Sequence, residues 1–124
     1  MAEFDESNML DGFTLDSTGG VWMTAIVSNR LWYVMSGGRP RLLIEDACQE
    51  QLARLTKMQQ GTGVLRSILY EEHSSTLRNI SSLAFGGPDL MTAYLGSLMG
   101  SCLLAFRSPV AGQKPAHWDF GPFG

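Results

Sequence analysis

The sequence predicts an all-β fold with one inserted helix, built from two four-stranded antiparallel sheets of the kind that forms a propeller blade. Three observations support this prediction. Short apolar runs rich in Val, Ile, Trp, Tyr and Thr are separated by turns containing Gly, Asp, Ser and Asn. The same order of short strand, Gly-rich turn and longer strand with a central aromatic recurs near the other end of the chain. One stretch between the two units has helical periodicity.

The first predicted unit covers residues 11–45. Its four apolar runs are short enough to be strands, and the segments between them are rich in turn-forming residues. The Asn29-Arg30 pair lies in one such turn, where Asn29 can adopt the left-handed conformation that a hairpin needs. The predicted strands are Gly12–Leu15, Val21–Ile26, Leu31–Val34 and Arg41–Ile44.

A helix is predicted for Asp46–Gln60, because apolar residues recur there at three- and four-residue spacing. Asp46 is expected to cap its first turn, and Gly61 follows its end. The next stretch, Val64–Tyr70, is compatible with either a strand or a helix. We expect residues 46–79 to form an insertion that lies across one end of the two sheets.

The second predicted unit covers residues 80–120. A Gly-Gly-Pro-Asp turn at residues 86–89 lacks the spacing and the Lys-Ser/Thr of a phosphate loop, so we expect it only to connect two strands. The predicted strands of this unit are Ser81–Phe85, Thr92–Leu98, Cys102–Phe106 and Ala116–Phe120.

The composition indicates one folded domain, residues 1–124. Hydrophobic residues make up 44% of the chain and charged residues only 17%, so a protein interface is expected to cover part of the exterior. The net charge of −3 gives no electrostatic reason to expect a nucleic-acid partner. No apolar span of membrane length and no signal peptide is recognisable, so the expectation is a cytoplasmic protein with Cys48 and Cys102 reduced.

Both units carry a resemblance to a known family. The stretch DGFTLDSTGGVWMTAIVSNRLWYV, and the later ISSLAFGGPDLMTAYLGSLMG followed by FRSPVAG, resemble the C-terminal part of the SMP-30/gluconolactonase/LRE-like family. This family includes the regucalcin-type sugar lactonases. The resemblance implies two blades of a six-bladed β-propeller, a divalent metal at the mouth of a central channel, and hydrolysis of a sugar lactone or related ester.

The resemblance singles out Asp11 as the metal-binding and catalytic residue. Asp11 occupies the place of the family's metal-ligating Asp before Gly, with Leu10 where the family has proline. Calcium or zinc is the expected ion, and it would polarise the lactone carbonyl and acidify a bound water. Read without the resemblance, Asp11 is an aspartate that shapes the turn before a strand.

Fewer indications exist for other site residues. Arg30 is a candidate substrate-binding residue, although a place in the hairpin turn beside Asn29 is the favoured interpretation. His73 and His117 have no neighbours at ligand spacing and are predicted to be surface or packing residues. No Gly-x-Ser-x-Gly segment surrounds any serine, which argues against a serine hydrolase.

Two blades alone would expose two apolar flanks, so the sequence predicts self-association. A ring of three copies is favoured, because it would supply six blades and bring three Asp11 side chains together. A dimer, or a missing partner fragment from another polypeptide, is the alternative. Two functions follow: a metal-dependent lactonase completed by assembly, or a non-catalytic assembly or binding module.

Overall fold

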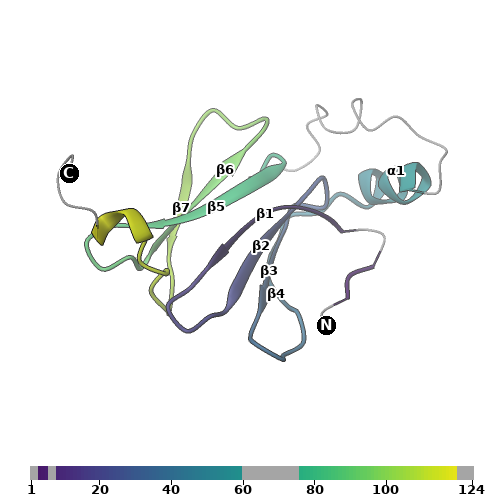
Figure 1. Cartoon of the computed structure of the whole chain (residues 1–124). Coiled ribbons are helices and arrows are strands. Elements are labelled where there is room, and N and C mark those ends of the chain that lie inside the picture. Colours follow the sequence, from purple (N-terminus) through teal and green to yellow (C-terminus); the bar gives the residue numbers. More distant parts are fainter. Residues whose placement is uncertain (1–2, 6–7, 60–75, 120–124) are drawn as a thin grey trace.

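Two antiparallel β-sheets pack against each other in the computed structural model, which describes residues 3–5, 8–59 and 76–119. Helix α1 lies at one end of the sheets, and the short 3₁₀ helix η1 lies at the opposite end (Figure 1). The predicted β-rich fold with one α-helix is confirmed for the described residues. Its identity as part of a propeller stays a prediction.

The first sheet matches the predicted unit closely. Its four strands follow one another in space as they do in sequence, each antiparallel to the next. The hairpin between the second and third strands contains Asn29 with φ 49°, so the predicted left-handed asparagine is confirmed. The strands are β1 (Met9–Leu15), β2 (Val21–Ile26), β3 (Arg30–Val34) and β4 (Arg41–Glu45).

The second sheet has three strands in the described part of the chain, β5 (Ile80–Gly86), β6 (Thr92–Ser97) and β7 (Leu104–Arg107). The predicted fourth strand at Ala116–Phe120 is wrong, because Ala116–Asp119 forms the 3₁₀ helix η1.

The path of the chain after β7 explains the missing strand. The Ser17 N–H donates to Ala111 O at 2.8 Å, and the Gln113 N–H donates to Leu15 O at 3.0 Å. An isolated bridge also joins Asp16 to Gly112. The chain therefore crosses the end of the β1–β2 hairpin and does not turn back beside β7.

Helix α1 covers residues Gln49–Gln59. The predicted cap at Asp46 is wrong, since the helix begins three residues later. Oδ2 of Asp46 instead accepts hydrogen bonds from the N–H groups of Thr76 and Leu77, at 2.8 and 3.0 Å. The buried Leu55 packs against the end of the β2–β3 hairpin, at Ile26 and Val27. The predictions for Val64–Tyr70 and His73 lie outside the described residues.

The main core lies between the two sheets. The Trp22 ring, 2% exposed, meets the Phe85 ring at 5.4 Å between centroids and 88° between planes, which is the favoured edge-to-face arrangement. Gly12 allows β1 to approach β5, because a Cβ at Gly12 would lie only 2.5 Å from Ser81 O. The other core residues include Leu31, Ile80, Leu83, Ala93 and Leu95.

A buried pair of asparagines joins the two sheets at the α1 end. Oδ1 of Asn29 accepts hydrogen bonds from the N–H groups of Asn79 and Ile80, at 2.7 and 3.2 Å. Nδ2 of Asn29 donates to Oδ1 of Asn79 at 3.2 Å and to Val27 O at 3.1 Å. These bonds satisfy buried backbone donors that no strand ladder reaches, so the pair fixes how β5 enters the core.

Candidate interaction surfaces and predicted site residues

Asp11 lies on β1 at a β-bulge, where its side chain is exposed. The β1–β2 register shifts between Leu10 and Phe13. At this bulge, the hydroxyl of Thr24 forms hydrogen bonds with the backbone of Gly12. The Gly12 N–H donates to Thr24 Oγ1 at 3.1 Å, and that hydroxyl donates back to Gly12 O at 3.2 Å. The bulge thus re-aims the residues around Asp11, as bulges commonly do near functional sites.

Further metal ligands do not join Asp11 in the described part of this single chain. Residues 3–5, 8–59 and 76–119 contain no group of three or more His, Cys, Asp or Glu side chains that could hold a metal ion. His117 lies exposed on η1, as predicted for a surface histidine. The metal-binding and catalytic roles of Asp11 stay predictions, since they depend on ligands that a second polypeptide would supply.

Arg30 has a structural position at the start of β3. Its Nε donates to Glu45 Oε2 at 2.7 Å across the β3–β4 ladder, and Nη1 donates to Asn8 Oδ1 at 3.3 Å. The side chain is only 13% exposed. These contacts tie β3, β4 and the N-terminal segment together. The predicted substrate contact by Arg30 is untested, and the observed geometry gives the residue a role in holding the sheet edge.

The buried carboxylate of Asp16, in the β1–β2 hairpin, accepts four hydrogen bonds. Its Oδ1 accepts from the Thr18 N–H and hydroxyl and from the Gly20 N–H, while Oδ2 accepts from Trp22 Nε1 at 3.0 Å. Burial by itself raises the pKa of this carboxyl, but the four hydrogen bonds outweigh it and lower the pKa to about 2. Sequence reasoning assigned Asp16 only to a turn and missed its bond to the Trp22 indole.

A second acidic group with a lowered pKa lies in the β5–β6 turn. Arg107 on β7 binds Asp89 through two parallel hydrogen bonds, Nη2 to Oδ2 at 2.8 Å and Nη1 to Oδ1 at 3.2 Å. These bonds, with the N–H of Met91, lower the pKa of Asp89 to about 2. Both side chains are exposed, so the pair orders the turn without contributing much stability.

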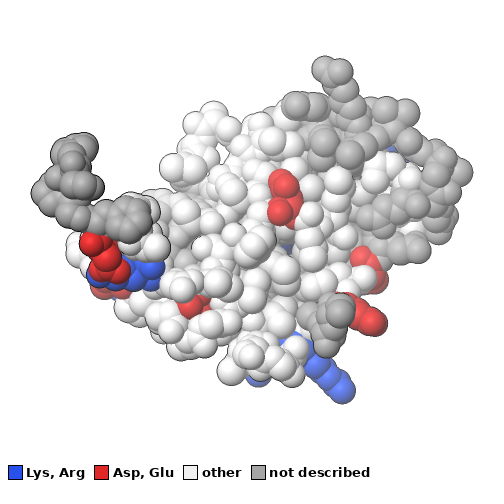
Figure 2. Space-filling model, in the orientation of Figure 1, with Lys and Arg blue, Asp and Glu red and all other residues white. Residues whose placement is uncertain are grey.

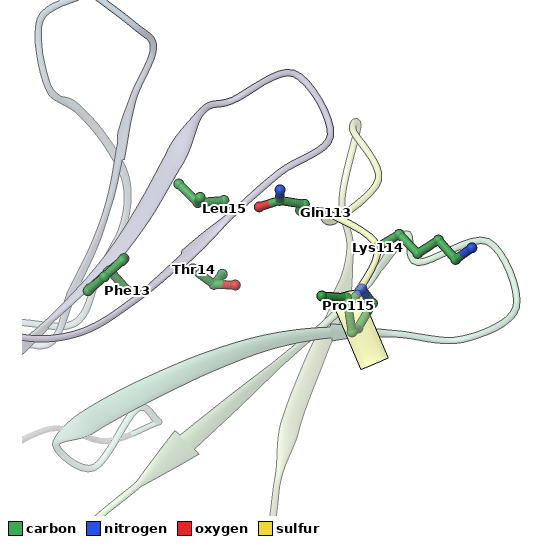
Figure 3. A pocket seen from close by; sticks show the side chains of 7 residues that line it. Phe13, Thr14, Leu15, Gln113, Lys114 and Pro115 are labelled. Atoms are coloured by element: carbon green, nitrogen blue, oxygen red, sulfur yellow. The ribbon is translucent and has the colours of Figure 1, made fainter. Parts of the chain in front are cut away.

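A cleft beside β1 (the β1 cleft) has a volume of about 470 Å³. Figure 3 shows Phe13, Thr14 and Leu15 of β1 on one side and Gln113, Lys114 and Pro115 on the other. Among the described residues that line it, Lys114 alone is basic, and its Nζ is paired with Asp119 Oδ1 at 2.6 Å. Because this cation is already neutralised, the β1 cleft offers a charged ligand little recognition.

A cleft of equal volume lies between the last strands of the two sheets (the β4–β7 cleft). Apolar and aromatic side chains form most of its walls, and two arginines lie among them. Arg107 is bound to Asp89, whereas Arg41 is exposed and has no hydrogen-bond or ion-pair partner within the described ranges. The lining residues are Trp22, Tyr33, Arg41, Leu43, Ile44, Phe106, Arg107, Pro109 and Val110.

The face of the first sheet that points away from the second sheet is apolar over two of its three cross-strand rows. Cross-strand partners share a face, so the register places on this side the rows Leu15–Val21–Val34, Phe13–Met23–Trp32–Leu42 and Leu10–Ala25–Arg30–Glu45, the last of which carries the Arg30–Glu45 ion pair. We call the seven residues of the first two rows the apolar outer face. Phe13 is 70% exposed and Leu42 43%. Charged side chains are sparse over the side of the molecule seen in Figure 2.

The corresponding face of the second sheet carries mostly small side chains. The register places Ser82 beside Gly96, Ala84 beside Tyr94, and Tyr94 beside Ala105. We call this surface, with Gly86, Thr92 and Arg107, the small-residue face. The large side chains Leu83, Phe85, Leu95, Leu104 and Phe106 point the other way, into the core.

Comparison with protein-family models, curated proteins and solved structures found no match for this chain. Neither helix in the described ranges is long and apolar enough to cross a membrane. The described residues form a two-sheet antiparallel β-protein whose apolar outer face is partly exposed.

Proposed function

We propose that this chain is a non-catalytic binding and assembly module whose apolar outer face packs against another β-sheet. The observation that carries the proposal is the composition of that face. All seven of its side chains are apolar, on a sheet whose other face already packs into the core. Large exposed apolar patches usually mark protein interfaces.

Among the described residues, the N-terminal segment covers one side of this face. The Phe4 ring packs edge-on against the Trp32 ring at 5.3 Å, and Trp32 Nε1 donates to Asn8 Oδ1 at 2.8 Å. Phe13 and Leu15, on β1, remain 70% and 36% exposed. A partner would therefore bury the β1 side of the apolar outer face, where the free energy gained by burial is greatest.

The partner that fits this surface is the small-residue face of a second copy. Large side chains such as Phe13 and Met23 can pack over the small side chains of Ser82 and Ala84, as large side chains pack against small ones in protein cores. This contact uses two different surfaces, so each copy can bind a further copy on its other side. Such heterologous contacts generate rings when the rotation closes. A ring of three is the proposed assembly.

Lactone hydrolysis at Asp11 depends on the same assembly. Three exposed Asp11 carboxylates brought together by a ring could hold a calcium or zinc ion, but one carboxylate is too few ligands. A lactonase function therefore requires the assembly, and a chain that is monomeric in solution would have no such metal site.

Cysteine cross-linking tests the orientation of the contact. In a background with Cys48→Ser and Cys102→Ser, a Leu15→Cys chain is mixed with an Ala84→Cys chain under mild oxidation. The proposal predicts a mixed disulfide dimer in preference to either homodimer, because the contact joins unlike faces. A Ser36→Cys chain, exposed in the β3–β4 turn, is the control and should not cross-link. Equal cross-linking of all three chains would contradict the proposal.

A further inference from the structure

The second sheet ends in a strand edge that is free in the described part of the chain. β7 pairs with β6 on one side, and no strand within residues 3–5, 8–59 or 76–119 pairs with its other side. The Ser108 N–H points to β6, where it donates to Met91 O at 2.8 Å. By the alternation of an antiparallel ladder, the N–H groups of Ala105 and Arg107 then point outward from the edge.

The β4–β7 cleft lies directly beside this edge. The inward-facing residues of β7 are Leu104 and Phe106, and Phe106 lines the cleft opposite Tyr33 and Arg41. The first sheet has a fourth strand, β4, whereas β7 is the third and last strand of the second sheet in the described residues. The cleft is therefore the space that the side chains of a fourth strand on β7 would fill.

The lining of the cleft defines the sequence of such a strand. Leu43 and Ile44 line the cleft and favour an apolar side chain from such a strand. Arg41 also lines the cleft, and its exposed guanidinium, which has no partner in the described residues, favours a carboxylate. Side chains of one face alternate along a strand, so the two positions are two residues apart.

We propose that the free edge of β7 takes an added β-strand from another polypeptide, with an apolar and an acidic side chain two residues apart filling the β4–β7 cleft. Main-chain hydrogen bonds to Ala105 and Arg107 give affinity, and the cleft gives specificity. Strand addition of this kind satisfies the exposed backbone groups that make free edges prone to pairing. This edge is separate from the apolar outer face, although the side chains of Ala105 and Arg107 lie on the small-residue face.

The test uses the full chain and two synthetic eight-residue strand peptides. Both peptides have valine and threonine in alternation, with one valine replaced by glutamate in the first peptide and by lysine in the second. Binding is followed by the amide NMR shifts and hydrogen exchange of residues 104–107. The proposal predicts saturable shifts and slowed exchange at Ala105 and Arg107 with the glutamate peptide, and at least about tenfold weaker binding of the lysine peptide.

Variants separate the charge from the strand edge. Arg41→Ala should weaken binding of the glutamate peptide about tenfold, whereas Arg39→Ala, which removes an exposed arginine two residues before β4, should change nothing. Ala105→Pro removes one outward N–H and should abolish binding of both peptides. If Ala105→Pro does not fold, the Arg41 and Arg39 pair still decides the outcome. Equal binding of both peptides, or no shift in β7 with either peptide, would overturn the proposal.

Discussion

Phe13→Ala should weaken self-association strongly without unfolding the chain. Phe13 is 70% exposed, and a phenylalanine side chain presents roughly 200 Å², so about 140 Å² is left for a partner to bury. At about 25 cal/mol per Å², this area corresponds to roughly 3.5 kcal/mol per contact. Alanine keeps a small part of it, so the expected loss is about 2–3 kcal/mol, a factor of about 30 to 150 in the dissociation constant.

Sedimentation velocity over a concentration series measures this loss. Leu103→Ala is the matched control, because Leu103 is 71% exposed but lies in the loop before β7, outside both proposed contact faces. The wild type and Leu103→Ala should associate alike, and Phe13→Ala should need a much higher concentration. Identical association of all three chains would refute the assignment of the apolar outer face as the contact.

Three further predictions concern the fold that presents these surfaces. Gly12→Val should destabilise the chain by about 3 kcal/mol in urea unfolding, because its Cβ would lie 2.5 Å from Ser81 O and force the sheets apart; an unchanged midpoint would contradict the close β1–β5 approach. Asn29→Ala should cost about 3 kcal/mol, since it leaves buried N–H groups unpaired and strains a residue at φ 49°. Asn29→Asp should not restore this stability, because its second carboxylate oxygen would be buried against the acceptors Val27 O and Asn79 Oδ1. The pKa of Asp16 falls from 3.8 to about 2 on folding, so its stabilisation is present above pH 3.8 and is lost as the pH falls through about 2. Asp16→Asn should lower the free energy of unfolding by about 2 kcal/mol at pH 7, because its NH₂ group would place a second donor against the Trp22 N–H. The same substitution should remove the loss of stability at low pH, and a dependence of stability on pH identical to that of the wild type would contradict this assignment.

Local patterns were sufficient to predict the first sheet. The runs at Val21–Ile26 and Arg41–Ile44 are bounded by turn residues that act within a few positions, and Asn29 could be expected in a left-handed turn. Contacts between distant segments were not visible in the same way. Asn79 lies 50 residues from Asn29, and nothing in the sequence indicates that the two side chains meet.

The two incorrect predictions have the same kind of cause. The segment after Pro115 has a strand-like composition, but the backbone bonds of Ala111 and Gln113 to the first hairpin carry the chain across the sheet end. Asp46 has the composition of a helix cap, yet the backbone of Thr76 and Leu77 uses its carboxylate. In both cases a tertiary contact outweighs a local preference, which a single sequence does not reveal.

The candidate site could be predicted only in part. Low charge content and apolar strands indicated an interface, but the register of the strands was needed to show that the seven apolar residues of the apolar outer face lie on one side of the first sheet. The β4–β7 cleft depends on the second sheet ending at β7, which the sequence did not indicate. Asp11 was singled out by resemblance alone, and its metal site remains a prediction.

The solution mass of the purified chain tests the assembly most directly. Light scattering during size-exclusion chromatography, at several loading concentrations and with and without added calcium, gives the mass of the species present. The proposed ring predicts a mass near three times 13.6 kDa that falls on dilution and is lost in Phe13→Ala. A single species of 13.6 kDa at every concentration would contradict the assembly, and with it the proposed role of Asp11.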